Sequence, residues 1–257
     1  MFKGLYTAYT GMINEQNRMD VLTNNLANAD TTGFKKEGST SQAFDDVLAL
    51  KIKDASISPN IPKKIGIANL GVKVGENYTD YSQGAFRITD NSYDVALSGE
   101  GFFNIEYTNK AGVTSTKYTR DGSFVVNVDG YLVTKDGDYV LGQNGRIKVD
   151  PTKDIVIDSK GNISQNNVRV AQIKLTDFED YDYLEHFGEN FYQPVDGATE
   201  KAATATVHQG YLETSNVQVV SEMVEMISVS RQYESNQKII TTIDGTAEIA
   251  STQLGRV

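Results

Sequence analysis

Apolar residues recur every seven positions at both ends of this chain. One repeat runs through Leu5, Met12, Met19 and Leu26, and the other through Val219, Met226, Tyr233, Ile240, Ala247 and Leu254. Spacings of three and four add Ala8, Leu22, Met223, Val229, Ile243 and Ala250. Such a repeat places a narrow apolar stripe along a helix, which is the pattern of a helix that packs on another helix. The spacing therefore predicts two terminal helices that pair with each other.

The length of the second repeat favours a partner outside a compact body. A helix from Ser215 to Leu254 would be roughly 60 Å long at 1.5 Å per residue. A compact domain of about 130 residues measures only about 35 to 40 Å across. The helix must then overhang such a body, and the amino-terminal helix is the other candidate partner within the chain. Packing of both stripes on a globular core is the alternative interpretation.

Between the two repeats, the chain has the pattern of a β domain. Asp-Gly or Asn-Gly steps at 121–122, 129–130, 136–137 and 144–145 separate short runs of Tyr, Val, Ile and Phe. These steps are typical of turns between antiparallel strands. The pattern predicts an α+β chain with terminal coiled-coil helices, a central all-β domain and extended β-type linkers. The expected segments are an N-terminal helix, a connector, the β domain, a return linker and a C-terminal helix, at 1–33, 34–75, 76–195, 196–212 and 213–257.

Composition narrows the classes of function. The 257 residues carry a formal net charge of −10, and the basic doublets are Lys35-Lys36 and Lys63-Lys64. Binding of a phosphate backbone calls for clustered Lys and Arg, so we expect no nucleic-acid partner. No apolar run approaches the roughly 20 residues that span a bilayer, so we expect no membrane insertion. Glu15, Arg18 and Asp20 interrupt the region where a cleavable signal would have its apolar run.

The chain offers few residues for catalysis or metal binding. It has no cysteine, and its two histidines, His186 and His208, fit no triad order or metal-ligand spacing. Gly99-Glu100-Gly101 precedes a strand pattern without a lysine, which argues against a phosphate loop. Glu179-Asp180 and Asp182 could serve a glycosidase, but a solvated acidic face explains them more simply. We therefore expect no enzyme activity, no cofactor and no metal.

Two blocks of sequence resemble the bacterial flagellar rod and hook proteins. The first is NNLANADTTGFK at 24–35, at the end of the first predicted helix. The second is QGYLETSNV at 209–217, followed by Glu222-Met223-Val224 and by RQYE at 231–234. Between them, residues 94–103, 118–124 and 188–190 are similar to the distal rod subgroup. The likeness covers essentially the whole chain.

The resemblance implies a structural subunit of the flagellar basal-body rod. In that family, the terminal helices pair as an axial coiled coil lining a tube, and the polymer transmits torque and conducts export. The implied partners are further copies in a helical homopolymer, neighbouring rod proteins, the hook protein and the flagellar type III export apparatus. The implied location is the basal body in the cell envelope and periplasmic space, reached without a cleaved signal peptide.

Two alternatives stay open beside a distal rod subunit. Residues 40–70 resemble distal rod proteins in length more than in sequence. A proximal rod subunit of the same family is therefore the second interpretation. The third is a wall-binding or wall-active β-domain protein that its coiled coil merely dimerises. Isolated amphipathic helices lack a burial partner, so for a rod subunit we expect the terminal segments to become ordered on assembly.

Asparagines near the end of the first repeat add a register hypothesis. Asparagine is a poor residue for a helix interior, so Asn24, Asn25 and Asn28 could mark the helix end alone. With the family resemblance, we interpret their amides as groups that fix register between subunits, because mispaired buried amides are costly. The candidate assembly interface comprises Leu5, Met12, Met19, Leu22, Asn24, Asn25, Leu26, Asn28, Val219, Met223, Met226, Tyr233, Ile240, Ile243, Ala247 and Leu254. Gly245 in the second helix costs roughly 1 kcal/mol against alanine, so we expect a bend or fraying there.

Overall fold

The computed structural model describes residues 2–51, 63–110, 112–188 and 190–254. Glu189, in the similar segment 188–190, and the middle of the expected connector lie outside the described residues. The chain divides into two compact units. Unit 1 comprises Met1–Leu26, Glu37–Thr79 and Val219–Val257, and unit 2 comprises Ala27–Lys36 and Asp80–Gln218. Within the described part of the chain, no helix is both long and apolar enough to cross a membrane.

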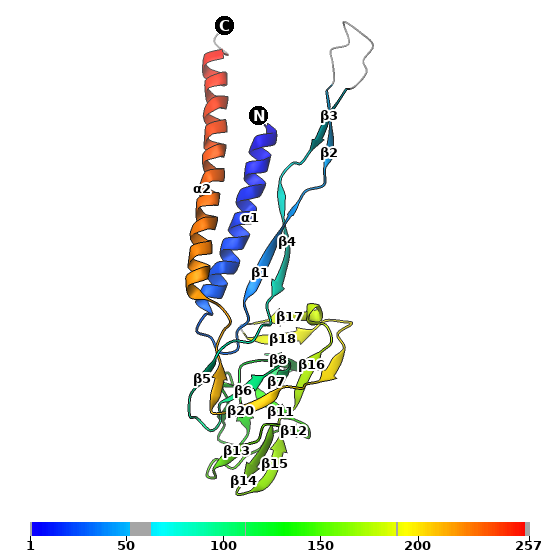
Figure 1. Cartoon of the computed structure of the whole chain (residues 1–257), viewed down its shortest axis with the longest axis vertical. Coiled ribbons are helices and arrows are strands. Elements are labelled where there is room, and N and C mark those ends of the chain that lie inside the picture. Colours follow the sequence, from blue (N-terminus) through cyan, green and yellow to red (C-terminus); the bar gives the residue numbers. More distant parts are fainter. Residues whose placement is uncertain (1, 52–62, 111, 189, 255–257) are drawn as a thin grey trace. The chain divides into compact units, whose positions relative to one another are not determined.

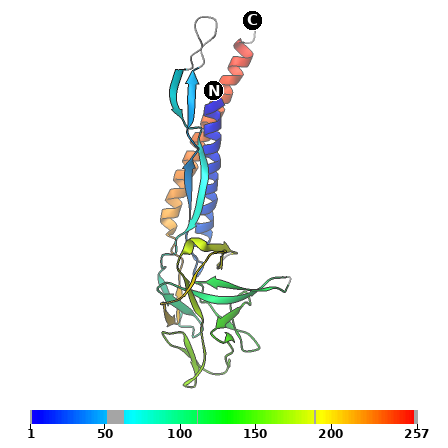
Figure 2. The same cartoon turned by 90° about the vertical axis from the view of Figure 1, so that its right-hand side faces the viewer.

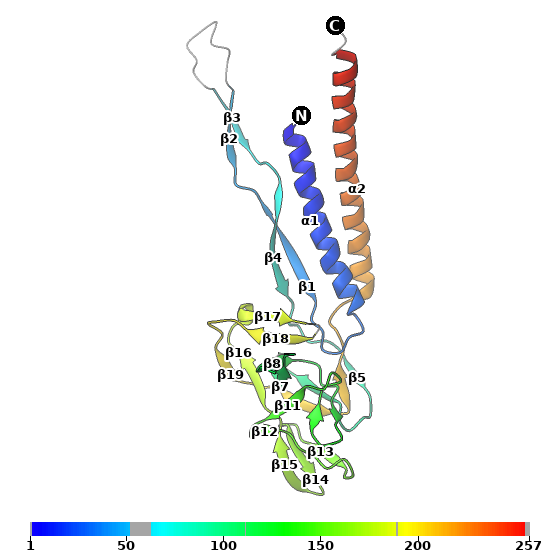
Figure 3. The same ribbon diagram turned by 180° about the vertical axis from the view of Figure 1, so that it is seen from behind.

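Unit 1 contains two long helices that run side by side in opposite directions (Figures 1 and 3). They are α1 (Phe2–Ala27) and α2 (Val219–Ile249), and α2 ends in the π-helical turn η2 (Ala250–Leu254). The predicted helices at both ends are therefore present. Residue Gly245 lies inside α2, four residues before the α-helix passes into η2, and the expected bend or fraying there stays a prediction.

A long β-ladder completes unit 1 and lies along α1 (Figure 2). Strand β1 (Glu37–Ala43) pairs with β4 (Val72–Thr79), and β2 (Val47–Lys51) pairs with β3 (Lys63–Ala68), both antiparallel. The Thr7 hydroxyl donates to the Leu70 carbonyl at 3.2 Å. Residue Gly71 approaches α1 so closely that a Cβ on it would stand 2.2 Å from Thr10 Oγ1. The expected connector is thus largely strand, held on the helix by a glycine contact.

Unit 2 is a β-rich body whose pairings are all antiparallel. Its strands are β5 (Phe86–Ile88), β6 (Val95–Ser98), β7 (Phe102–Thr108), β8 (Thr114–Thr119), β9 (Val125–Val126), β10 (Leu132–Val133), β11 (Tyr139–Gly142), β12 (Gly145–Arg146), β13 (Ile155–Ile157), β14 (Asn162–Gln165), β15 (Val168–Gln172), β16 (Leu175–Phe178), β17 (Leu184–Phe187), β18 (Phe191–Pro194), β19 (Glu200–Ala202), β20 (Thr206–Gln209) and β21 (Tyr211–Glu213). The main sheet has the order β17-β18-β8-β7-β11-β10-β9, with β12 beside β11, β16 beside β7 and β19 beside β16. A three-stranded sheet, β13-β14-β15, and the pairs β20-β6 and β21-β5 complete it.

Two apolar clusters fill unit 2. The larger includes Val95, Leu97, Phe103, Ile105, Phe124, Leu132, Val140, Ile147, Ile163 and Val207. The smaller is aromatic and gathers Phe102, Tyr118, Phe178, Leu184 and Tyr192. Alternation along each strand supplies these side chains, since successive residues point to opposite faces of a sheet. A β body with its own core follows from the pattern of short apolar runs.

The glycine steps that predicted turns have two different roles. Residues Gly130, Gly137 and Gly145 have φ of 83°, 95° and 106°, the left-handed conformation of tight turns. Residue Gly122 does not form a hairpin turn. A Cβ on it would stand 1.6 Å from the Val95 carbonyl oxygen, so this glycine permits a close backbone approach.

Regular structure extends through the acidic segment before the return linker and into the linker itself. The acidic and aromatic segment 178–191 forms the 3-10 helix η1 (Tyr181–Tyr183), β17 and the start of β18. The expected return linker includes β19, which pairs with β16. The α-helix near the C-terminus begins at Val219, after β21, although the expected helical segment began at residue 213. The cause is that residues 211–213 are used as a strand on β5.

Candidate assembly site

The contacts between α1 and α2 follow one line on each helix, which we call the helix seam. They join Gly4 to Ile243, Gly11 to Asn236, Glu15 to Gln232, Arg18 to Glu225 and Asn25 to Glu222. The α1 positions 4, 11, 18 and 25 are seven apart, as the repeat predicted. They lie one residue before the apolar series at 5, 12, 19 and 26, so the helix pair uses a neighbouring line of α1.

Small residues allow close approach in the first half of α1. A Cβ on Gly11 would stand 2.9 Å from the Asn236 side-chain nitrogen, and one on Gly4 would stand 3.7 Å from Ile243 Cδ1. Residue Ala8 is buried between these two glycines. Periodicity of large apolar residues does not reveal such a line, because glycine and alanine carry little or no apolar side chain.

Charged and amide groups form the second half of the helix seam. The Arg18 guanidinium pairs with Glu15 at 3.2 Å and with Glu225 at 3.0 Å. Residue Glu15 is buried, and the amide nitrogen of Gln232, in its hydrogen-bonding orientation, donates to it at 3.1 Å. Polar groups therefore hold the two helices in one alignment where apolar contacts alone would permit sliding.

Asn25 joins the helix seam to the β-ladder. Its side chain is closed to solvent, and its Nδ2 donates to the Glu37 carbonyl at 2.7 Å and to Glu222 Oε2 at 3.3 Å. The Glu37 backbone N–H donates to Asn25 Oδ1 at 2.9 Å. This amide thus pairs with one residue of β1 and with one carboxylate of α2. These contacts lie within one chain, and a role between subunits stays a prediction.

The remaining predicted interface residues differ in exposure. Residue Leu22 is buried, and the half-buried ones are Met12, Met19, Leu26, Asn28, Met226, Tyr233, Ile240 and Ile243. Those left exposed are Leu5, Asn24, Val219, Met223 and Ala247. The Leu254 side chain lies outside the described residues. The Asn28 carbonyl and side-chain oxygens accept from Thr31 at 3.1 and 3.2 Å, in the turn that follows α1.

Apolar side chains also face away from the helix seam. On α2, Val220, Val224 and Ile227 form a line with spacings of four and three, and they are 76%, 63% and 55% exposed. We call this line the outer stripe. On α1, Leu5, Tyr6, Tyr9 and Ile13 are also exposed. A helix that is apolar on more than one face is usually covered on each of them. Unit 1 therefore presents apolar surface that its own chain leaves open.

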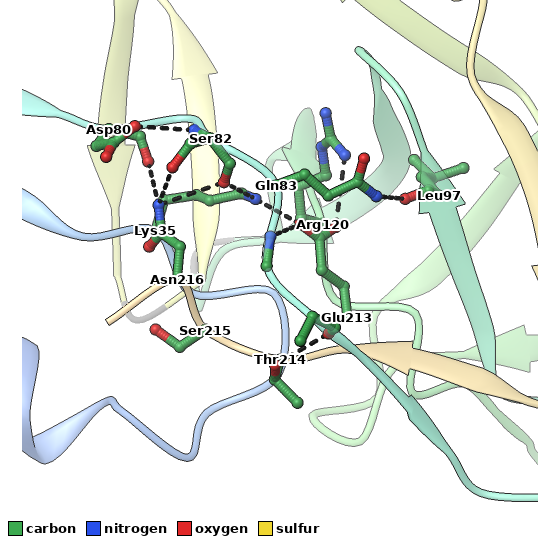
Figure 4. Close-up of polar contacts among 12 residues, drawn as sticks. Lys35, Asp80, Ser82, Gln83, Leu97, Arg120, Glu213, Thr214, Ser215 and Asn216 are labelled. Carbon is green, nitrogen blue, oxygen red and sulfur yellow. Dashed lines mark hydrogen bonds and ion pairs between the residues drawn. The ribbon is translucent and has the colours of Figure 1, made fainter. Parts of the chain in front are cut away.

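A second feature, the buried triad, consists of Lys35, Arg120 and Glu213 in unit 2 (Figure 4). The Lys35 ammonium lies 2.5 Å from Glu213 Oε1, and Arg120 Nη1 lies 3.4 Å from Glu213 Oε2. The Gly84 N–H donates to Glu213 Oε1 at 3.0 Å, and Lys35 also donates to the Ser82 carbonyl at 2.9 Å. Burial lowers the pKa of Lys35, while the Glu213 carboxylate opposes this by favouring the charged amine.

Asn216 extends the buried triad to the points where the chain leaves unit 2. Its side-chain oxygen accepts from the Lys36 N–H at 2.7 Å, and its nitrogen donates to the Asp80 carbonyl at 2.8 Å. The Asp80 N–H donates to the Lys36 carbonyl at 2.8 Å. Three distant stretches of chain are thereby joined side by side.

The residues of the buried triad and Asn216 lie in the sequence motifs, but the sequence did not predict them as site residues. Lys35 ends the first block, Glu213 and Asn216 lie in the second, and Arg120 lies in the segment 118–124. Among the described residues, no group of three histidine, aspartate or glutamate side chains is arranged to hold a metal ion. The arrangement binds distant parts of the chain to one another.

Comparison with known proteins gives matches along the chain. Residues 5–35 match the family described as flagella basal body rod protein, residues 96–165 the flagellar hook protein FlgE/F/G D1 domain, and residues 208–253 the flagellar basal body rod FlgEFG protein C-terminal. The chain is 34% identical to the flagellar basal-body rod protein FlgG of Bacillus subtilis, over 95% of this chain and 96% of the relative. It is 33% identical to FlgG of Buchnera aphidicola subsp. Schizaphis graminum over the same shares. It is 32% identical to the flagellar basal-body rod protein FlgF of Caulobacter vibrioides, over 100% of this chain and 98% of the relative.

Proposed function

Because the chain belongs to the flagellar basal-body rod protein family and is a structural subunit of the rod, we propose that it is a distal rod subunit that polymerises through its terminal helices. In this proposal, α1 and α2 act as an axial coiled coil, and copies add head to tail into a tubular drive shaft. The shaft transmits torque to the hook and conducts exported subunits.

The exposed outer stripe is the observation that supports polymerisation most directly. Val224 and Ile227 are each more than half exposed, although they lie on a helix whose opposite line is already paired with α1. Burial of apolar area contributes about 25 cal/mol per Å², so covering such side chains favours association. A surface that binds a different surface on the next copy does not close on itself, and its repetition builds a helical filament.

The distal assignment rests on the relatives. Several proteins named FlgG match at 32% to 34% identity across nearly the whole chain, and they support a distal rod subunit. The FlgF relative matches at 32% over the full length, which favours a proximal rod subunit as the second candidate.

The proposal also covers the assembly partners of the chain and its export. The family supports assembly with other rod proteins and with the hook protein in the basal body. We assign export to the flagellar type III apparatus, with the terminal segments ordering when the copies meet. Asn24, Asn25 and Asn28 stand where register between copies is set, beside the turn that ends α1.

Electron microscopy of basal bodies from a strain lacking this chain tests the proposal. A distal subunit predicts that the rod segment next to the hook is missing while the segment next to the cell membrane remains. Loss of the entire rod indicates a proximal subunit. Intact rods and normal motility contradict both, and a peptidoglycan turnover assay on the purified protein then tests the wall-active alternative.

A further inference from the structure

A cleft in unit 2 has the opposite charge to the chain as a whole. It has a volume of about 610 Å³ and opens beside the β11–β12 hairpin and β15. Three cations line it, Arg146, Lys148 and Arg169, and no aspartate or glutamate does. The complete chain carries a formal net charge of −10. We call this feature the basic cleft.

Two of the three cations lack a carboxylate partner among the residues that the structure describes. Arg146 is held by Glu106, with hydrogen bonds of 3.0 and 2.7 Å, and its guanidinium lies 4.1 Å from the centre of the Tyr139 ring. Lys148 and Arg169 are exposed, and neither has a carboxylate within ion-pair distance in the described ranges. The Arg169 guanidinium donates to the Gln172 amide oxygen at 2.7 Å, which holds it beside the cleft.

The basic cleft also has an apolar surface and amide groups. Val170 lines it and is 45% exposed, and Gln143 and Asn144 add exposed amides. Cations beside an exposed apolar side chain are complementary to an acidic peptide segment that also carries an aromatic side chain. They fit a small inorganic anion less well, because such an ion leaves the apolar surface uncovered.

Unit 2 contains a segment of that composition around η1. Glu179, Asp180 and Asp182 are exposed, and Tyr183 is 45% exposed. Asp180 accepts from the Asp182 N–H at 3.0 Å, so the turn that presents these groups is internally braced. The nearby cation Lys201 is paired with Asp177 at 3.0 Å, and among the described residues none of the three exposed acids has an ion-pair partner. We call residues 179–183 the acidic knob.

The acidic knob and the basic cleft lie at opposite ends of unit 2. Figures 1 and 3 place β12 and β15 at one end of this unit, and β17, which follows η1, at the other. A knob therefore cannot reach the cleft of its own unit 2. Complementary surfaces at opposite ends of one body are the arrangement that joins successive copies head to tail.

We propose that the acidic knob of one copy docks in the basic cleft of the next copy in the rod. Asp180 and Asp182 face Lys148 and Arg169, and the Tyr183 ring covers Val170. The inference rests on the proposed function, because a second copy at high local concentration exists only in the polymer. Exposed charge pairs are screened over about 8 Å at physiological salt, so the contact sets orientation and rate of addition more than total affinity.

A charge-swap experiment on the full chain tests the proposal. Lys148→Glu with Arg169→Glu, or Asp180→Lys with Asp182→Lys, is expected to slow polymer growth about tenfold at low ionic strength. The swap of all four in one chain is expected to restore growth, since complementarity returns with reversed sign. Lys110→Glu with Lys135→Glu changes the charge by the same amount outside both surfaces and is expected to leave growth unchanged. All of these positions are exposed, so circular dichroism should report a folded protein in each case.

The outcomes separate this proposal from the proposed function. If neither double reversal slows growth, or the fourfold swap fails to restore it, the knob does not dock in the cleft. Polymer growth that depends on the outer stripe and not on these charges leaves the rod function standing without this contact. If the cleft variant grows normally but no longer pellets with isolated peptidoglycan, the cleft binds the wall polymer, and docking between copies is wrong.

Discussion

The Lys35 ammonium and the Glu213 carboxylate form a buried ion pair at 2.5 Å between residues that are 178 positions apart. The first residue ends the block that spans the end of α1, and the second stands shortly before α2. Arg120 from the centre of the chain joins them. Unit 2 therefore closes only when the beginning, the middle and the end of the chain have met.

Glu213→Gln should destabilise unit 2 strongly. The change leaves Lys35 and Arg120 buried without an anion, and removal of one partner from a buried pair typically costs about 3 to 5 kcal/mol. Urea unfolding followed by tyrosine fluorescence measures the loss. Glu106→Gln, at the more exposed pair with Arg146, is the matched control and should shift the midpoint far less. Equal midpoints for the two variants would show that the buried triad does not hold unit 2 together.

Gly84→Ala should prevent closure of the same region. A Cβ at this position would stand 1.8 Å from the Thr214 carbonyl oxygen, a backbone atom that moves only with β21. The expected result is a lower unfolding temperature and protease cleavage near residues 84 and 214. Gly245→Ala is the control, because nothing lies within 4 Å of its added Cβ and a helix gains about 1 kcal/mol from alanine. A Gly84→Ala protein as stable as wild type contradicts the close approach.

Asn25→Asp should be more damaging than Asn25→Ala. An aspartate cannot donate to the Glu37 carbonyl, and it places a second carboxylate beside Glu222, whereas alanine only removes the amide. Both variants should reduce the helical signal and motility, with aspartate the worse of the two. Gln16→Glu, the same kind of amide-to-carboxylate change at an exposed position of α1 outside the candidate interface, should behave as wild type. The reverse order of severity would show that Asn25 does not join β1 and α2.

Stability should fall at alkaline pH because of Tyr118. Burial raises the pKa of its phenol, and a hydrogen bond of 2.6 Å to Glu200 raises it further. The unfolded phenol releases its proton near its ordinary pKa of 10.0, while the folded one keeps it. Above this pH the unfolded state binds fewer protons, so the free energy of unfolding decreases as pH rises.

Unfolding free energies at about pH 9 and about pH 11 measure this dependence. Tyr118→Phe should be less stable than wild type at the lower pH, because the bond to Glu200 is lost, and it should lose less on going to the higher pH. Burial also raises the pKa of Tyr181. Its phenol should therefore contribute to the alkaline loss of stability in both proteins. An equal alkaline loss in wild type and Tyr118→Phe would exclude this phenol as a source.

The sequence predicted the elements better than it predicted their contacts. Seven-residue spacing identified both terminal helices, and the added spacings of three and four included Leu22, which is buried. It missed the line through Gly4, Gly11 and Arg18, because the helices approach through small and polar residues that an apolar repeat does not detect. The Lys35–Glu213 pair was also missed, since local periodicity carries no information on contacts 178 positions apart. Strand order in unit 2 depends on the same kind of distant pairing.

The outer stripe provides the most direct test of the central claim, that terminal helices bind neighbouring copies through faces their own chain leaves open. Val224→Asp with Ile227→Asp is compared with wild type by sedimentation and electron microscopy of the full chain. Gln237→Asp with Thr241→Asp, at exposed polar positions of α2, is the control. The account predicts that the stripe variant keeps a folded unit 2, because Val224 and Ile227 belong to unit 1, but stays monomeric while wild type and control form rods. Rods of normal length from the stripe variant would contradict it.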